Sequence, residues 1–245
     1  MIGDKDKSEP SAAGAEPTIP PDSDLIIHQS DLLPGDVLLY RPRNFTNVQR
    51  AISKATGSPY THAAVYLGDG VVAESNVPLG VGKRALTESI GDYRCVAVLR
   101  SQSGFQGDRP QKLRAFVDDV LANKRLYNFN KVLCFKSRSD VYFNSQLDFI
   151  RENYGKVTAR DKLAKQAFFC SAFVVACYTV VGIIGESAQV AYQPNNFSPG
   201  HLHQDPTFGW LLGFLVPEGG SVPADDPVLT QATYWRDVMG ARWWP

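Results

Sequence analysis

A chain of 245 residues can build one large domain or two small ones around a substantial core. Its basic and its acidic side chains number 25 each, so no charge excess favours nucleic acid or an anionic membrane surface as a partner. The four cysteines show neither a CxxC pair nor metal-ligand spacing, and a chain with this much apolar sequence does not need a disulfide framework. We therefore expect reduced thiols, no metal site and no cofactor.

Residues 1–24 are rich in Pro, Ala, Ser, Gly, Asp and Glu and lack the apolar stretch of a secretory signal. This composition predicts a disordered leader, followed by a single domain over residues 25–245. We expect the protein to stay in the cytoplasm as synthesised, unless a specialised secretion system carries it to the periplasm of a target cell.

Short apolar runs separated by turn residues dominate the first half of the chain. They predict buried strands at residues 37–40, 61–67, 71–75 and 95–99. Gly68-Asp69-Gly70, between the second and third runs, is typical of a β-hairpin turn. Residues 47–54 predict a helix that ends before Gly57.

Helical patterns follow in the second half. After Pro110 the apolar residues recur at helical spacing and predict an amphipathic helix; they are Leu113, Phe116, Val117, Val120 and Leu121. Residues 137–166 predict a polar helical insertion, and residues 169–181 predict a central helix that is apolar on nearly every side. From about residue 203 the chain becomes a C-terminal extension; its tryptophans are Trp210, Trp235, Trp243 and Trp244.

The uncharged run at residues 167–185 is long enough to suggest a membrane span. The same run contains polar and turn-forming residues, namely Ser171, Tyr178, Thr179, Gly182 and Gly185. These favour a buried core helix followed by a turn, so we predict no transmembrane segment.

Cys170 stands where the central helix begins, and His62 stands where the second strand begins. A helix N-terminus and a nearby imidazole both lower the pKa of a thiol, and the resulting thiolate is a good nucleophile. Together the two residues suggest a cysteine hydrolase.

The register of the predicted hairpin decides whether a carboxylate reaches His62. A two-residue turn at Asp69-Gly70 would place Val65 opposite Glu74 and turn Glu74 away from His62. A three-residue loop would place Ala64 opposite Glu74, so that His62 and Glu74 become diagonal neighbours about 7–8 Å apart on one face. The last glycine of the loop suits the left-handed position that such a loop requires, which favours this second register.

In that arrangement Cys170 is the nucleophile, His62 takes the thiol proton, and Glu74 orients the imidazole. If the register slips, Ser75 or Asn76 would take the place of Glu74. Backbone N–H groups at the start of the helix would offer an oxyanion site.

Each of these residues also has a structural interpretation. A cysteine in an apolar helix usually packs in the core, which is how we interpret Cys95 and Cys177. Two further histidines, His201 and His203, lack a third ligand and are weak evidence for a metal, and His28 lies beside the leader.

Five short segments together resemble the circularly permuted papain-like hydrolases of the NlpC superfamily, in particular their YiiX-like branch. The segments are residues 33–37, 61–66, 72–74, 170–174 and 197–199. That branch places the histidine before the cysteine and uses a carboxylate as the third residue, which the order His62, Glu74, Cys170 matches. The resemblance covers about residues 31–202 in patches, and Tyr127-Asn128 is similar to a tyrosine that the family often carries. The 137–166 insertion and the Trp-rich tail have no counterpart that we can place.

The resemblance implies an α+β fold in which a small antiparallel sheet or barrel packs against a central helix that carries the cysteine. It also implies a cysteine peptidase or amidase acting on a bacterial cell-wall (peptidoglycan) peptide, or on another short peptide or isopeptide. Delivery as an antibacterial effector would bring in an immunity or carrier protein as a partner. The sequence does not specify the oligomeric state.

Two other functions remain open. One is a lipid acyl hydrolase or acyltransferase that resembles the lecithin:retinol acyltransferase relatives, although these usually carry a second histidine where this chain has Glu74. Apolar residues near the tail would then line an acyl groove; they are Phe208, Trp210, Leu211, Leu212, Phe214 and Leu215. The other is a non-catalytic binding module on the same scaffold, in which Cys170 is an inert core residue.

Overall fold

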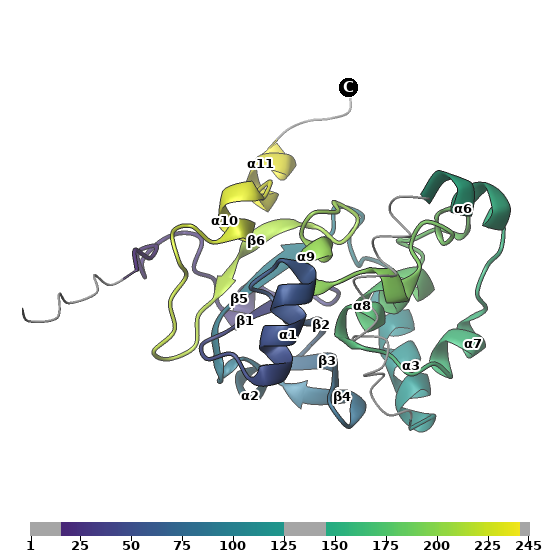
Figure 1. The fold of residues 1–245 in the computed structure, drawn as a ribbon, viewed down its shortest axis with the longest axis horizontal. Helices are drawn as coiled ribbons and strands as arrows, with labels where there is room; N and C mark the ends of the chain where they lie inside the picture. The colour runs from purple at the N-terminus through teal and green to yellow at the C-terminus, as the bar shows by residue number, and fades with distance from the viewer. Residues whose placement is uncertain (1–15, 125–145, 241–245) are drawn as a thin grey trace, which may run out of the picture.

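A computed structural model describes residues 16–124 and 146–240 of the chain. The fold is mixed α+β, built on a six-stranded antiparallel sheet with the strand order β4-β3-β2-β1-β5-β6 (Figure 1). The strands are β1 (Val37–Pro42), β2 (His62–Gly68), β3 (Val71–Asn76), β4 (Gly80–Ala85), β5 (Tyr93–Arg100) and β6 (Trp210–Leu215).

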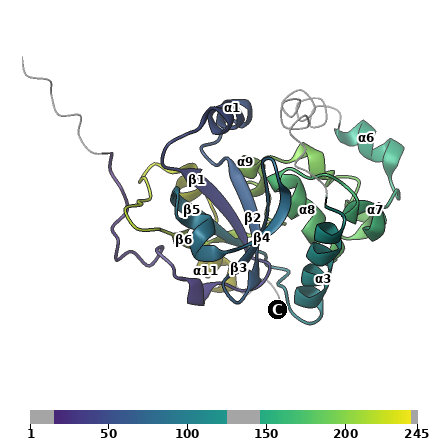
Figure 2. The same ribbon diagram turned by 90° about the horizontal axis from the view of Figure 1, so that it is seen from below.

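Helices flank this sheet. The longer ones are α1 (Asn47–Thr56), α3 (Arg109–Ala122), α6 (Gln146–Asn153) and α8 (Cys170–Val180). The shorter ones are α2 (Leu86–Ile90), α7 (Arg160–Ala164), α9 (Pro199–Leu202), α10 (Pro227–Gln231) and α11 (Trp235–Gly240). Three 3₁₀ turns complete the described elements: η1 (Gln29–Asp31), η2 (Glu186–Ala188) and η3 (Pro194–Asn196). Figure 2 shows α3, α7 and α8 grouped on one side of the sheet.

The two faces of the sheet carry different cores, because successive side chains of a strand point to opposite faces. Val37 and Leu39 of β1 belong to the larger cluster, which includes α3 and α8. Leu38 and Tyr40 belong to a smaller cluster on the other face. Both clusters are closed to solvent, so every residue of β1 except Arg41 is buried.

Helix α8 is the central helix that the apolar pattern predicts. Its residues from Cys170 through Tyr178 are all buried, as expected for a helix with no polar stripe. It ends where Gly182 adopts a positive φ of 76°, a conformation that favours glycine and stops a helix. In the part of the chain that the structure describes, no helix has both the length and the apolar content to cross a bilayer.

Several sequence predictions need correction. Residues 16–24, assigned to a disordered leader, are partly paired with the C-terminal segment: Ile19 N–H donates to Val222 O, and Ala224 N–H donates to Pro17 O. Residues 16–24 are therefore part of the folded region that the structure describes. Strands β4 and β6 were missed. Glycines interrupt β4, and β6 lies within the proline-punctuated segment that reads as loop.

Three of the apolar residues considered for an acyl groove lie in the core. Phe208, Leu211 and Phe214 are fully or almost fully buried and belong to the larger core. Several predictions concern residues outside the described ranges: Cys134, Tyr127-Asn128, the first part of the 137–166 insertion, and Trp243 and Trp244. The described part of that insertion forms α6 and α7.

Candidate active site

Cys170 is the first residue of α8 and is 3% exposed. Two side chains fix the backbone around it. The Ser75 hydroxyl donates to the carbonyl oxygen of Phe168 at 2.9 Å, and the Ser171 hydroxyl donates to the carbonyl oxygen of Phe197 at 2.7 Å. The thiol therefore lies at the N-terminus of a buried helix, where free backbone N–H groups favour negative charge.

His62 opens β2 and pairs with Tyr40 on the neighbouring strand. The imidazole lies against two aromatic rings, with centroid separations of 5.0 Å to Tyr40 and 6.5 Å to Tyr93. Its Nε2 lies 2.8 Å from Glu74 Oε2, and it also hydrogen-bonds with the Cys170 thiol. With Nε2 held by the carboxylate, Nδ1 is the ring nitrogen left for the thiol.

The predicted register is confirmed, although the turn differs from the predicted loop. Ala64 lies opposite Glu74, as expected for a shared His62–Glu74 face. The turn itself has two residues, Asp69-Gly70, both with positive φ (54° and 71°). A bulge at Leu67 inserts one extra residue into β2 and shifts the register by one position. The bulge thus places Ala64 opposite Glu74, the register that the three-residue loop was expected to produce.

A second layer of side chains holds the Glu74 carboxylate. Ser89 of α2 donates to Glu74 Oε2 at 3.1 Å, so its own oxygen accepts from the Tyr40 hydroxyl at 2.8 Å. Arg84 of β4 adds a longer contact of 3.4 Å to Glu74 Oε1. Tyr40, Ser89 and Glu74 are all buried, so the network fixes the carboxylate away from water.

Sequence reasoning missed Tyr40, Ser89, Arg84 and Tyr93. No local motif marks them. Ser89 lies in a five-residue helix, and Tyr40 reaches it only because β1 pairs with β2 in one particular register. A cavity of about 510 Å³ lies beside this network and is lined in part by Arg84, Ser89 and Tyr93.

The electrostatics favour an ion pair between the cysteine and the histidine. Burial by itself would raise the pKa of the Cys170 thiol, but the hydrogen bond and charge of His62, with the N–H groups of Ala63 and Ser171, bring that pKa below its ordinary value. Burial would lower the pKa of His62, whereas Tyr93 and the hydrogen bonds to Cys170 and Glu74 raise it well above its ordinary value.

Glu74 is ionised in this setting. Burial would raise the pKa of its carboxyl group, but the hydrogen bond and charge of His62, the Ser89 hydroxyl and Arg84 hold that pKa below the ordinary value. Glu74 is only 2% exposed, so its carboxylate is stabilised by these specific partners rather than by water.

The other described cysteines lack these features. Burial raises the pKa of Cys95 to about 12, and burial also raises the pKa of Cys177. Both are in the core, as the sequence predicts, and neither can supply a thiolate near neutral pH.

The histidines considered as metal ligands have other surroundings. His201 lies in the first turn of α9, where its Nδ1 accepts from Ser198 N–H at 3.4 Å. His203 follows α9. Over residues 16–124 and 146–240, no group of three or more His, Cys, Asp or Glu side chains is arranged to hold a metal ion.

The Gly-Asp motif before β1 is structural. Asp36 accepts from Leu33 N–H and from both Nε and Nη2 of Arg100, at 2.7–2.9 Å. The Tyr178 hydroxyl, near the end of α8, donates to Gly35 O at 2.9 Å. The motif thus ties the start of β1 to β5 and to the central helix.

The chain was compared with family models, curated proteins and solved structures. No family model and no curated protein matches the chain. Among solved structures, it is similar to the crystal structure of the metalloprotein yiiX from Escherichia coli O157:H7 (DUF1105), with 16% sequence identity and a TM-score of 0.39. The match covers 82% of this chain and 94% of the yiiX chain.

Proposed function

We propose that this protein is a cysteine hydrolase that cleaves an amide bond through an acyl-enzyme, with Cys170, His62 and Glu74 as its catalytic triad. One observation carries the proposal. The buried His62 imidazole hydrogen-bonds to Glu74 on one side and to the Cys170 thiol on the other, with the thiol at a helix N-terminus.

In the first step His62 takes the thiol proton, and the Cys170 sulfur attacks the carbonyl carbon of the substrate. The carbonyl π electrons move to the oxygen, and first-turn N–H groups of α8 stabilise the resulting oxyanion. The tetrahedral intermediate collapses, His62 gives its proton to the departing amine, and a thioester forms on Cys170. Glu74 keeps the imidazole oriented and stabilises its cation throughout.

In the second step His62 takes a proton from water, and the hydroxide attacks the thioester carbonyl. Collapse of the second intermediate breaks the carbon–sulfur bond and releases the carboxylic acid. The thiolate–imidazolium pair is then restored. The 510 Å³ cavity lined in part by Tyr93 and Ser89 lies beside the side chains that hold Glu74.

For the substrate we propose a short peptide or isopeptide, with bacterial cell-wall peptide as the first candidate. The support is the sequence resemblance to the permuted papain-like hydrolases of the NlpC superfamily, whose His–carboxylate–Cys order this chain shares. The antibacterial effector role is part of the same proposal and rests on the sequence alone.

The test is turnover of purified full-length protein on soluble cell-wall peptides and on generic short peptide amides. Cys170→Ala should abolish product, while the matched core variant Cys177→Ala should retain it. Mass spectrometry of the stalled enzyme should find the peptide acyl group on Cys170. Turnover that survives Cys170→Ala would overturn the proposal, and a fatty-acyl adduct from a phospholipid would move the function to the lipid class.

A further inference from the structure

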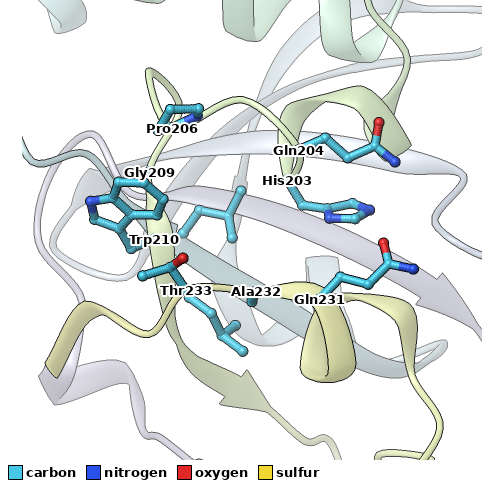
Figure 3. Close-up of a pocket in the computed structure, with 10 residues that line it drawn as sticks. His203, Gln204, Pro206, Gly209, Trp210, Gln231, Ala232 and Thr233 are labelled. Atoms are coloured by element: carbon cyan, nitrogen blue, oxygen red, sulfur yellow. The ribbon is translucent and has the colours of Figure 1, made fainter. Parts of the chain in front are cut away.

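A second cavity, away from the cysteine, lies between the start of β6 and the C-terminal segment. Its volume is about 250 Å³. Its lining combines apolar and uncharged polar residues: Leu99, His203, Gln204, Pro206, Gly209, Trp210, Leu211, Gln231, Ala232 and Thr233. Figure 3 shows His203, Gln204 and Gln231 on one side of this cavity, with Trp210 and Thr233 on the other.

The walls of this cavity are fixed by the fold. Leu211 N–H donates to Thr233 O at 3.0 Å, so the C-terminal segment lies along β6. Helix α10, which ends at Gln231, is capped by the fully buried Asp226, whose carboxylate pairs with Arg41 at 2.6 Å. These contacts hold the backbone around the cavity in place.

Gly209 shapes the rear wall of the cavity. It adopts a φ of 128°, and a Cβ atom there would lie 2.3 Å from the backbone carbon of Arg100. Only glycine lets β6 approach β5 this closely, so the chain bends at this point and leaves the space in front of Trp210.

The polar groups of the cavity are uncharged. Burial lowers the pKa of His203, so its imidazole is neutral near pH 7. The other polar side chains are the amides of Gln204 and Gln231 and the hydroxyl of Thr233. Among the described residues that line it, none carries a carboxylate, amine or guanidinium group. Each of these four groups can both donate and accept a hydrogen bond, as hydroxyl and acetamido groups of a ligand also can.

The apolar part of the lining includes one aromatic side chain, the indole of Trp210, together with Leu99, Pro206 and Leu211. An indole ring is flat and apolar on its faces. Such a surface packs against the C–H face of a ring by dispersion. Pockets for drug-sized ligands occupy roughly 300–1,000 Å³, so this smaller volume fits one compact ring rather than a peptide or an extended chain.

We infer that this cavity is a binding site for a single neutral sugar ring, held by hydrogen bonds from Gln231 and His203 and by packing on Trp210. A neutral ligand with many hydroxyl groups satisfies the amphoteric polar groups, and its C–H face matches the indole. A phosphate or carboxylate ligand would find no cationic partner among the lining residues that the structure describes. The inference does not depend on the chemistry at Cys170.

The position of the site relates it to the candidate active site. His203 directly follows α9, a helix of one turn that is about 6 Å long. Phe197, just before α9, accepts the hydrogen bond from Ser171, the neighbour of Cys170. At the same helix, a Cβ on Gly200 would lie 2.7 Å from Ser58 Cβ, four residues before His62. A sugar in the cavity would thus lie at the far end of a short helix that begins two residues after Phe197, the hydrogen-bond partner of Ser171.

Calorimetric titration of the full-length protein with N-acetylglucosamine tests the inference. We expect saturable binding with a dissociation constant in the millimolar range and no comparable binding of glucose 6-phosphate. Gln231→Ala should weaken the binding about fivefold, since it removes one hydrogen bond. The matched variant Gln111→Ala, an exposed glutamine on α3, should leave it unchanged.

Trp210→Phe provides a second readout, because it keeps an aromatic ring in β6. It should weaken the binding and remove the tryptophan fluorescence change that accompanies it. Absence of saturable binding, equal effects of Gln231→Ala and Gln111→Ala, or tighter binding of the phosphorylated sugar would overturn the inference. Cys170→Ala should bind the sugar normally, so a failure of the proposed hydrolase function would leave this result unaffected.

Discussion

Ser75 donates a hydrogen bond to the carbonyl oxygen of Phe168 at 2.9 Å, across 93 residues of sequence. Ser75 follows Glu74 on β3, and Phe168 lies two residues before Cys170. One hydrogen bond thus joins the strand that carries Glu74 to the segment that leads into the helix carrying the thiol. This hydrogen bond adds to the core packing that holds the two halves of the candidate site together.

Ser75→Ala should therefore damage the site more than an ordinary serine truncation. It leaves the buried Phe168 carbonyl without this donor, at a cost of about 1–3 kcal/mol in the free energy of unfolding. We also expect slower alkylation of Cys170 at neutral pH. Chemical denaturation and thiol labelling measure the two effects, and Ser53→Ala on α1, a helix with no buried residue, is the control. Equal stability and equal labelling of both variants would contradict this role.

The lowered pKa of Cys170 predicts its reactivity with iodoacetamide. A lower pKa means that the Cys170 thiolate forms at lower pH. Each unit by which the pKa falls raises the fraction of thiolate near neutral pH about tenfold. Cys170 should be alkylated below pH 7, while Cys95 and Cys177 stay silent because burial raises their pKa values. The protein is labelled at pH values from about 5 to about 9, and peptide mass spectrometry then shows which cysteines have been alkylated.

His62→Ala should suppress this low-pH reaction, since it removes the largest of the interactions that lower the pKa of the thiol. If Cys170 reacts only after denaturation, it is a core residue, and the binding-module hypothesis becomes the better one.

Glu74→Gln should reduce turnover without abolishing it, because it removes an orienting and charge-stabilising group rather than the nucleophile. The pKa of His62 should fall, since the carboxylate raises it in the wild type. The basic limb of the pH–rate profile, where the imidazolium loses its proton, should then move to lower pH. Ser89→Ala should shift the same limb in the same direction by a smaller amount. A profile unchanged in both variants would exclude the orienting role of Glu74.

The Arg41–Asp226 pair should be important for stability, because its carboxylate is fully buried and also accepts from the Tyr60 hydroxyl at 2.9 Å. Asp226→Ala would leave Arg41, which is largely buried, without its partner and should lower the free energy of unfolding by about 3–5 kcal/mol. Asp118→Ala, which breaks an exposed pair with Lys83, should cost about 0–1 kcal/mol. Urea denaturation of both variants makes the comparison, and similar midpoints would show that Asp226 does not anchor the C-terminal segment.

The sequence by itself determined the elements whose signals are local. The apolar run after Cys170 specified a buried central helix, and the spacing of Leu113 and Phe116 specified an amphipathic one. Turn chemistry around Asp69-Gly70 narrowed the hairpin to two registers, one of which brings His62 to Glu74. These signals are readable because hydrophobic period and turn preference depend on residues a few positions apart.

Only the tertiary structure decided how these elements meet. The Leu67 bulge, not a longer loop, sets the register. The contacts of Tyr40 with Ser89 and of Arg41 with Asp226 span 49 and 185 residues. Strand β6 and residues 16–24 join the fold through pairing with distant segments. Such contacts depend on the packing of the whole chain, because no short stretch of sequence contains both partners.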